Sequence, residues 1–349
     1  MHNLWSSASR SDGASARLGE TAPSARERPF GKPFWLWLFG LLALAAVILV
    51  VGRIGELRRF AELAREAEPR WLAAAFGLQV LTYLCASSVW HAALARAGAR
   101  RSLRSLVPLG VAKLFTDQAL PSGGISGTLL VMRGLARRGV PTPIAMGALL
   151  VGLVSFYIAY GVAALGGLAV LQIYDAIGPV VMAVAAVFAL FVVGVPVIVL
   201  SLRRVPSGSW LRRLRHAPHV TALLDAVAAA PSDLLRDPLL MAKTTILQLA
   251  IFLLDAATLG VMLRALGQSV PPVYVFGSFM VADVVATIGP IPLGLGIFEG
   301  ASVAMLSMTG VSIEAALAGT LLLRGFTFWL PMLPGLWLAH RELRGAPVP

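Results

Sequence analysis

Long apolar runs constrain the fold of this chain more than any other feature of its sequence. Several of them exceed the roughly 18 to 20 residues that an α-helix needs to cross the hydrocarbon core of a bilayer. The 349 residues are 58% hydrophobic and 13% charged, whereas about a quarter of the residues of a soluble domain are charged. The sequence therefore predicts an all-α, polytopic integral membrane protein.

The apolar runs fall into uninterrupted and interrupted segments. Six uninterrupted runs predict full spans, at about 34–52, 71–94, 143–172, 178–200, 240–263 and 314–339. Two further segments, 106–132 and 272–308, are broken near their middles by glycine and proline. Each broken segment is interpreted as a re-entrant helical hairpin, that is, two half-helices that enter and leave the membrane on one side. For the first segment, a single kinked span is the alternative.

The break in the second segment reads Pro-Ile-Pro-Leu-Gly-Leu-Gly-Ile-Phe-Glu and ends at Glu299. Pro290 and Pro292 remove backbone donors, while Gly294 and Gly296 weaken a helix further. At membrane depth, broken backbone is tolerated only where protein or a water-filled cavity satisfies it. An ionisable side chain at that depth is by default a functional-site hypothesis. We therefore expect this stretch to contribute to a binding site, with a plain kink as the alternative.

The break in the first segment lies in Thr-Asp-Gln-Ala-Leu-Pro-Ser-Gly-Gly, residues 116–124. Pro121 interrupts the helix, and Gly123 and Gly124 follow it. Both flanks of the segment carry several arginines, and loops rich in arginine tend to stay in the cytoplasm. A segment that leaves the cytoplasm and returns to it is re-entrant, which favours the hairpin.

The net charge of +12 comes mainly from arginines in loops and tails, as the positive-inside rule predicts, so it does not indicate nucleic-acid binding. We expect a disordered cytoplasmic tail at 1–33, a cytoplasmic loop at 202–240 with a short interfacial helix, and a cytoplasmic tail at 341–349. Both termini are therefore expected in the cytoplasm. The stretch 53–70 is interpreted as an amphipathic surface helix or as a solvated connecting helix. The single cysteine, Cys85, excludes an internal disulfide.

An internal repeat relates the two broken segments. They align at one constant offset along the chain, which places Pro121 on Pro292 and Gly123 on Gly294. The spans between them reverse the orientation of the second half, so we predict an inverted-topology repeat with a site near mid-membrane. Broken helices that meet there offer free N–H groups and helix dipoles, which suit an anionic group. The membrane part covers 34–340, and its repeat halves cover about 71–171 and 242–339.

Two charged residues lie within the second half. Neither Glu299 nor Arg324 should be unpaired in the membrane, since each charge costs at least about 2.5 kcal/mol at the bilayer centre. We therefore predict that the two side chains face one another or share a polar cavity. Either the pair only stabilises packing, or it opens so that Arg324 meets a lipid phosphate.

The candidate binding residues at the first break are Asp117, Gln118, Gly123, Gly124 and Arg133, as Gly294 and Gly296 are at the second. Lys113 lies four residues before Asp117, so these two can also simply pair along one helix face. For Arg133, a phosphate contact and plain snorkelling to the membrane interface both fit its position.

Two further carboxylates, Asp255 and Asp283, lie in apolar runs. They are interpreted either as proton-coupling groups or as polar links between helices, with the links preferred. The sequence shows no metal-ligand cluster, no nucleophile elbow and no phosphate-binding loop, and no soluble region large enough for a catalytic core. We therefore expect no metal, no cofactor and no enzymatic activity.

Both broken segments carry motifs that resemble those of a known family. Leu-Pro-Ser-Gly-Gly-Ile-Ser-Gly at 120–127, followed by Arg133, resembles its first signature. Pro-Leu-Gly-Leu-Gly-Ile-Phe-Glu at 292–299, followed by Leu-Arg at 323–324, resembles its second. The family is the lysylphosphatidylglycerol synthase transmembrane region, the flippase-like domain of the multiple peptide resistance factors. The resemblance covers about 35–340.

The resemblance implies translocation of membrane lipids between the leaflets of a bacterial inner membrane. In two-part members a soluble domain attaches lysine to the lipid. This chain shows no counterpart of that domain, so the resemblance implies a stand-alone member without synthase activity. The lipid stays open among an aminoacylated phosphatidylglycerol, another phospholipid, a polyprenyl-linked sugar and a hopanoid-type lipid. The alternatives are a transporter of a small soluble anionic solute and a non-transporting membrane partner of a lipid-biosynthetic enzyme.

Overall fold

The computed structural model describes Glu62, Arg65 and residues 67–120, 124–173, 179–201 and 225–344. Every helix below belongs to the compact unit 54–349. Helices are the only regular structure among the described residues, which confirms the all-α prediction. Several predicted features lie outside the described residues: the tail 1–33, the span 34–52, most of 53–70, Pro121 and Gly123 at the first break, most of the loop 202–240 and residues 345–349.

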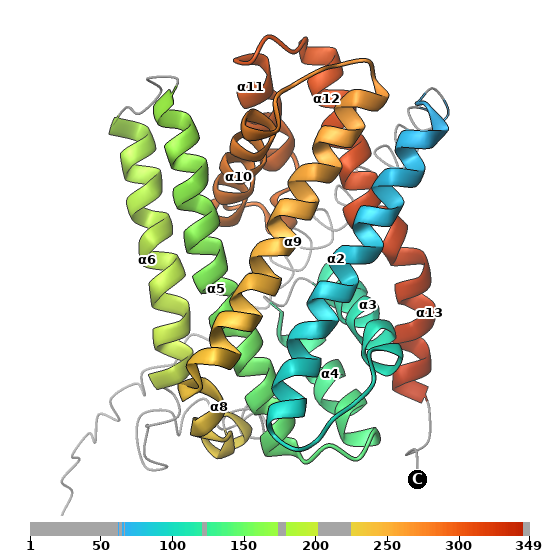
Figure 1. Cartoon of the computed structure of the whole chain (residues 1–349), viewed down its shortest axis with the longest axis vertical. Helices are drawn as coiled ribbons and strands as arrows, with labels where there is room; N and C mark the ends of the chain where they lie inside the picture. Colours follow the sequence, from blue (N-terminus) through green and yellow to red (C-terminus); the bar gives the residue numbers. More distant parts are fainter. Residues whose placement is uncertain are drawn as a thin grey trace, which may run out of the picture. The chain divides into compact units, whose positions relative to one another are not determined.

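Five helical runs within the described ranges are long and apolar enough to cross a membrane (Figure 1). Four are single helices: α2 (Pro69–Arg96), α5 (Thr142–Ile173), α6 (Pro179–Ser201) and α9 (Pro238–Ala265). The fifth joins α12 (Ile313–Arg324), the π-helical turn η4 (Gly325–Trp329) and α13 (Leu330–Arg344). These helices match the predicted spans from 71–94 onward and identify a multi-pass membrane protein.

Each broken segment consists of two short helices. The first contains α3 (Leu103–Ala119) and α4 (Ile125–Arg137). The second contains α10 (Pro272–Ile288) and α11 (Ile297–Ser307), with the 3-10 turn η3 (Pro292–Gly294) between them. The helices of each pair pack against each other, and the two pairs lie toward opposite ends of the unit (Figure 1). Each of these helices, at 11 to 17 residues, is shorter than a bilayer span.

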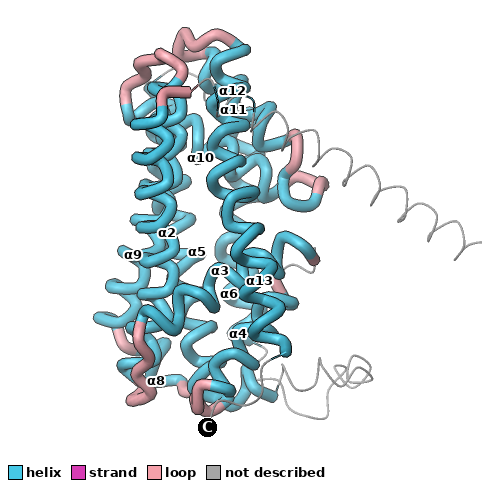
Figure 2. The backbone as a smooth tube through the Cα atoms, turned by 90° about the vertical axis from the view of Figure 1, so that its right-hand side faces the viewer, coloured by secondary structure: helices cyan, strands magenta, loops and turns pink. Residues whose placement is uncertain are grey.

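The helices of the two halves correspond in order and length. α2 and α9 each have 28 residues, and α3 and α10 each have 17. The run from Ile313 to Arg344 has the same length as α5. α2 and α9 lie side by side and run in opposite directions (Figure 1, Figure 2).

The first two helices of each half start within two residues of the positions that the predicted constant offset requires. α9 begins at Pro238 and α10 at Pro272, slightly earlier than the offset from Pro69 and Leu103 requires. α12 does begin where the offset from the start of α5 places it. The offset changes at the break, because the second connection contains η3 and is longer than the first. The prolines and glycines of the two breaks still align at the one offset, so the sequence alignment does not reveal the shift of the helix starts.

The junction between α2 and α9 shows how a polar residue begins a span. Asp237 precedes α9, and its Oδ1 accepts hydrogen bonds from the backbone N–H groups of Leu239 and Leu240, both at 3.0 Å. Its Oδ2 accepts one from Arg96, the last residue of α2, at 2.5 Å. The Leu240 N–H and the Arg96 guanidinium hold the pKa of Asp237 below its ordinary value, because both stabilise the ionised form. The cap satisfies donors that every helix start leaves open.

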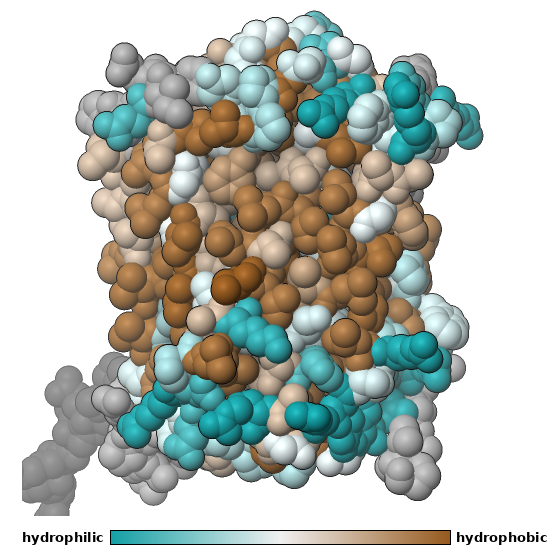
Figure 3. All heavy atoms as spheres, viewed as in Figure 1, coloured by the Kyte–Doolittle hydropathy of each residue, from teal (hydrophilic) through white to brown (hydrophobic). Residues whose placement is uncertain are grey.

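Two apolar cores share α5 and α9. One core surrounds α3 and α4, and the other surrounds α10, α11 and α12. Close contacts between helices depend on glycine in membrane proteins: a Cβ on Gly335 of α13 would lie 2.6 Å from the Cβ of Phe115 in α3. The C-terminal helix therefore packs directly on the first broken segment. On the outside of the unit, the face in Figure 3 shows apolar side chains between hydrophilic ends.

Candidate functional site

The break between α10 and α11 has an unusual backbone conformation. Leu293 has a φ of 63°, Gly294 of 61° and Gly296 of 78°; Gly124, which precedes α4 at the first break, has a φ of 85°. For a residue with a Cβ, such as leucine, the left-handed conformation costs about 1–2 kcal/mol. Nη2 of Arg324 donates to the Leu293 and Gly294 carbonyls at 3.1 and 3.3 Å. Strain of this kind is concentrated at functional sites.

Glu299 and Arg324 form the predicted ion pair. Nε of Arg324 donates to Oε1 of Glu299 at 2.6 Å, and the backbone N–H of Gly296 donates to Oε2 at 2.6 Å. Glu299 is 7% exposed and lies in the first turn of α11, where the helix dipole favours a carboxylate. Both carboxylate oxygens are engaged within the protein. In this structure Glu299 therefore positions Arg324 and the start of α11.

Aromatic rings complete the surroundings of Arg324. Its guanidinium carbon lies 4.9 Å from the ring centroid of Phe298 and 5.8 Å from that of Phe328, within reach of cation–π attraction. Arg324 ends α12, and the π-helical turn η4 follows it directly; π-helical turns are frequent at functional sites. None of its hydrogen bonds within the described part of the chain uses Nη1. The guanidinium is thus fixed in place and keeps donors for a ligand.

A cavity of about 380 Å³ adjoins the break, and Arg324 and Gly294 form part of its wall. Asp283 and Thr287, from the last turns of α10, contribute the other polar side chains. Glu299 is not part of the wall but pairs with Arg324, which is. The volume is in the range of small-molecule binding sites. The remaining wall residues are Ala286, Gly289, Pro290, Ile291, Leu293 and Phe298.

Two hydroxyl residues at this site, Tyr160 and Thr287, could not be recognised as site residues from the sequence. The Tyr160 hydroxyl of α5 lies 2.7 Å from Oγ1 of Thr287, and Tyr160 is only 2% exposed. The Asp283 carboxylate also interacts with Tyr160. These contacts join α5 to the polar wall of the cavity. A single tyrosine or threonine in an apolar run is indistinguishable from a packing residue until the helices are placed.

The residues of the first break form a separate arrangement. Nζ of Lys113 lies 2.5 Å from Oδ2 of Asp117, which confirms their pairing along α3. The backbone N–H of Gly127 donates to Oδ1 of Asp117 at 2.9 Å, so Asp117 ties α3 to the first turn of α4. Arg133 is exposed on α4 and forms no ion pair with any described residue. Neither Asp117, Gln118 nor Arg133 contributes to the wall of the cavity at the second break.

Asp255 lies on α9, away from the cavity wall. Nε2 of Gln79, which is buried on α2, donates to Oδ1 of Asp255 at 3.0 Å and lies 3.1 Å from Oγ1 of Thr258. This geometry is that of a polar link between α2 and α9, and a coupling role for Asp255 stays a prediction. The described residues include no group of three or more His, Cys, Asp or Glu placed to hold a metal ion.

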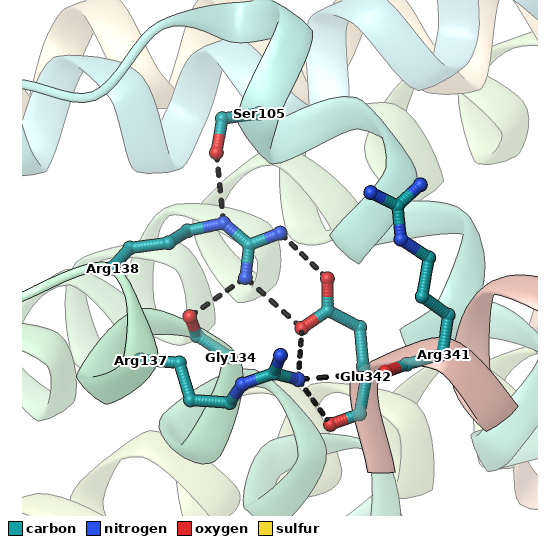
Figure 4. A network of polar contacts seen from close by, with 6 residues as sticks. All are labelled: Ser105, Gly134, Arg137, Arg138, Arg341 and Glu342. Carbon is teal, nitrogen blue, oxygen red and sulfur yellow. Dashed lines mark hydrogen bonds and ion pairs between the residues drawn. The ribbon is translucent and has the colours of Figure 1, made fainter. Parts of the chain in front are cut away.

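A polar network ties α13 to the first broken segment (Figure 4). The Glu342 carboxylate accepts two hydrogen bonds from Arg138, at 2.6 and 3.0 Å. Nε of Arg138 donates to Oγ of Ser105 at 2.8 Å, and Arg137 donates to the Glu342 carbonyl at 2.7 Å. A bidentate arginine–carboxylate pair is stronger and more specific than a single bond. The network therefore clamps α3, α4 and α13 together.

Comparison with known proteins agrees with the motifs at the two breaks. A family described as lysylphosphatidylglycerol synthase TM region matches residues 36–335, which include both broken segments, the cavity wall and Arg324. No curated protein matches the chain. The matched residues make up most of the sequence, so the resemblance predicted from the two motifs is confirmed.

Proposed function

We propose, from the premise that the chain belongs to the lysylphosphatidylglycerol synthase TM region family, that it moves a lipid with a polar, anionic headgroup between the leaflets of a bacterial inner membrane. The observation that carries this proposal is Arg324, fixed on the wall of a cavity of about 380 Å³ beside a broken helix. Charges at membrane depth are costly and mark substrate or ion pathways. Arginine also suits a phosphate group, because its donors match two phosphate oxygens at once.

A second cavity favours a lipid over a small soluble solute. It has a volume of about 590 Å³, lies between α5, α6, α10 and α11, and is lined by apolar side chains and glycine. Met280, Val281 and Val284 line it, whereas Asp283 and Thr287 line the polar cavity. At 100° per residue, Met280 and Thr287 project from nearly the same side of α10, two turns apart. One helix thus contributes to both a polar cavity and an apolar one, which suits a molecule with a headgroup and acyl chains.

We also infer that α3–α4 and α10–α11 are re-entrant hairpins in an inverted-topology repeat, alongside about six full spans. The equal lengths of α2 and α9 and of α3 and α10 support this inference. The opposite directions of α2 and α9, and the positions of the two pairs toward opposite ends, support it as well (Figure 1). In transporters built from such repeats, the substrate binds near the midplane at discontinuous helices.

Charge supports a cytoplasmic location for the end of α13, while the N-terminus, also predicted in the cytoplasm, lies outside the described residues. The end of the unit that holds the α2–α3 connection also holds the end of α4 and the end of α13 (Figure 1). Arginines concentrate there, and arginine-rich connections favour the cytoplasmic side. The arginines at this end include Arg96, Arg100, Arg101, Arg104, Arg137, Arg138 and Arg341.

Within this proposal the residues have distinct roles. Arg324 binds the headgroup, and Glu299 holds Arg324 at the break. Contacts of Asp117, Gln118 or Arg133 with the headgroup stay predictions, because these residues belong to the other break. The proposal assigns the chain transport without catalysis.

Reconstitution in liposomes tests the proposal. Purified protein is incorporated with phosphatidylglycerol that carries a fluorophore on one acyl chain, and exchange between leaflets is followed by chemical quenching of the outer leaflet. Arg324→Ala is expected to slow exchange by about tenfold or more, the equivalent of one lost charge-assisted contact. Arg264→Ala, at an exposed arginine in the last turn of α9, is the matched control and should exchange at the wild-type rate.

The outcomes separate the rival functions. Absence of exchange in folded wild-type protein, for every lipid offered, would contradict a flippase. Uptake of a soluble anion without lipid exchange would identify a solute transporter. If the cellular function survives Arg324→Ala in folded protein, the role is that of a non-transporting partner of a lipid-biosynthetic enzyme.

A further inference from the structure

We propose that Asp255 and Asp283 form one proton-binding pair, and that a proton bound there crosses the membrane together with each anionic headgroup. This inference rests on the proposed function and adds an energy source to it, the pH gradient across the membrane. A proton from water forms an O–H bond with one carboxylate oxygen of the pair, and that bond breaks when the proton returns to water on the other side. One proton and one singly charged anion move together, so the step transfers no net charge.

The two carboxyl groups belong to neighbouring helices and influence each other. α9 and α10 pack together, and the Asp283 carboxyl acts electrostatically on Asp255. Within the described ranges, no ion pair joins either aspartate to a basic side chain. Two like charges disfavour each other, and an unpaired charge at membrane depth is costly. A single proton on the pair removes one of the two charges and relieves both costs.

The hydrogen bonds at Asp255 suit a neutral acid. Nε2 of Gln79 donates to Oδ1 of Asp255 at 3.0 Å. The Thr82 hydroxyl also interacts with this carboxyl, but it donates to the Leu78 carbonyl of its own helix at 3.1 Å. A hydroxyl has one hydrogen to donate, so Thr82 offers Asp255 a lone pair. A lone pair is satisfied by the O–H of a protonated acid and is repelled by a carboxylate.

The Tyr83 hydroxyl is a second, independent sign that Asp255 changes its protonation. Its oxygen is buried and has no hydrogen-bond partner among the described residues, and Asp255 acts on it electrostatically. Tyr83 follows Gln79 by four residues, so both project from one face of α2. A buried donor without a partner is costly. This hydroxyl is the donor available to Asp255 once the proton has left and the acid has become a carboxylate.

Asp283 connects the pair to the polar cavity. Its carboxyl is hydrogen-bonded to the Tyr160 hydroxyl, which lies 2.7 Å from Oγ1 of Thr287. Asp283 and Thr287 both lie on the cavity wall. A hydroxyl both donates and accepts hydrogen bonds, so the two hydroxyls give a proton a short route between the cavity and the carboxyl.

Few other ionisable groups face the pair. Tyr83 faces it from α2, Tyr160 from α5 and Arg324 from α12. Glu299 of α11 pairs with Arg324 at 2.6 Å, and α6, which packs against α10, has no ionisable side chain. Among the described residues, no further ionisable group acts on either carboxyl. The protonation of the pair is therefore set inside the unit rather than by a charged surface.

The charges at the cavity explain why a proton and an anion enter together. With Asp283 ionised, Arg324 serves two carboxylates, its partner Glu299 and Asp283 on the same wall. An anionic headgroup would then add a third negative charge to one positive charge. A proton on Asp283 removes one of these charges and leaves Arg324 to attract the phosphate. Binding of the proton therefore favours binding of the anion, and by linkage the anion favours the proton equally.

Lipid accumulation driven by a pH gradient tests the inference. The purified protein is reconstituted in phosphatidylcholine liposomes with a trace of acyl-labelled phosphatidylglycerol. Valinomycin and equal potassium on both sides hold the membrane potential at zero, and protein-free liposomes give the background. With the outside more acid by one pH unit, the wild type should enrich the label about tenfold in the inner leaflet, because one unit is a tenfold ratio of protons. This final ratio does not depend on the orientation of the protein in the liposome.

Variants assign the effect to the pair. Asp283→Asn imitates the protonated acid permanently, so it should keep exchange at equal pH and lose the enrichment under the gradient. Glu314→Gln, which replaces a carboxyl by an amide at an exposed residue of α12, is the matched control and should enrich the label as the wild type does. Tyr160→Phe removes the relay, so the same final enrichment should be reached more slowly. Asp255→Asn removes the neighbouring carboxyl, so more acid should be needed for half-maximal exchange.

Each outcome has a definite meaning. Exchange at equal pH without enrichment under the gradient would overturn the inference while the flippase proposal stands. Enrichment that Asp283→Asn retains would place the proton elsewhere and overturn it too. So would enrichment driven by a potassium diffusion potential instead of the pH gradient, since the anion would then cross alone. Failure of the folded wild type to exchange any lipid would contradict the proposed function itself.

A spectroscopic measurement keeps the inference testable without transport. Infrared spectra of the detergent-solubilised protein record the carbonyl stretch of protonated carboxyl groups as the pH is lowered. The spectrum of the wild type minus that of Asp283→Asn should contain one titrating carboxyl band, and this band should titrate at a lower pH in Asp255→Asn. Absence of a titrating band from the difference spectrum, or an unchanged titration in Asp255→Asn, would overturn the inference.

Discussion

Replacing Glu299 with glutamine removes one charge from the buried pair while nearly preserving its shape. The Arg324 side chain is 16% exposed, so its charge would remain largely buried beside an amide. Removing one partner of a buried ion pair costs about 3–5 kcal/mol. The amide oxygen of glutamine can still accept one of the two hydrogen bonds that Glu299 accepts at 2.6 Å. We therefore expect the free energy of unfolding to fall by about 3 kcal/mol, at the lower end of that range.

A double-mutant cycle isolates the pair. Glu299→Gln, Arg324→Gln and the double variant are unfolded reversibly in mixed micelles by a denaturing detergent, with helix content followed by circular dichroism. The double variant should lose less stability than the two single variants added together, with a coupling energy of about 2 kcal/mol. Glu314→Gln, at an exposed glutamate in the first turn of α12, is the control and should cost no more than about 0.5 kcal/mol. Additive effects of the two substitutions would refute the reasoning.

Three further predictions concern the break, the clamp and the helix cap. Gly294→Ala should destabilise the protein by about 2 kcal/mol, because the new Cβ would lie 2.6 Å from the Cβ of Ala286 at a φ of 61°. Gly300→Ala is the control and should not destabilise it, because an added Cβ there meets nothing within 4 Å. Equal melting temperatures for the two variants would contradict this prediction. Glu342→Gln breaks the bidentate pair with Arg138, so α4 and α13 should move more freely relative to each other. Cysteines placed on these two helices, at positions too far apart in this structure to react, should then be trapped more often as a disulfide. Unchanged trapping would show that packing alone holds α13. The pKa of Asp237 is depressed in the folded protein by the Leu240 N–H and an arginine of α2. The contribution of Asp237 to stability is therefore present above the ordinary aspartate pKa of about 3.9 and is lost as pH falls through the lower folded value. Asp237→Asn should remove that part of the acid dependence of the melting temperature, and a pH profile identical to that of the wild type would contradict this prediction.

The spans were predictable because their cause is local. A run of apolar residues of sufficient length has to cross a bilayer wherever it occurs, so the predicted span 71–94 agrees with α2 (Pro69–Arg96) to within two residues at each end. The breaks were predictable for the same reason, since proline and glycine act on their own turn. The pairing of Glu299 with Arg324 followed from the cost of an isolated charge in the membrane.

The composition of the site was only partly predictable. Sequence patterns placed Asp117, Gln118 and Arg133 beside Arg324 as binding candidates, but in the structure Asp117 ties α3 to α4 and none of the three lines the cavity. Tyr160 was not predicted, although it contacts Thr287 on the cavity wall. These assignments depend on which helix faces pack together, and no periodicity within one segment contains that information.

By itself, the sequence determined that this is a helical, multi-pass membrane protein with two breaks, and that its buried charges require partners. Only the tertiary structure decided which carboxylate serves which role. Glu299 accepts hydrogen bonds from Arg324 and from the start of α11, and Asp255 accepts one from α2. Asp283, in contrast, lies on the cavity wall. The physical reason is that all three are carboxyl groups in similar apolar stretches of sequence, so their chemistry is set by neighbours from other helices. Those neighbours are brought to them by packing.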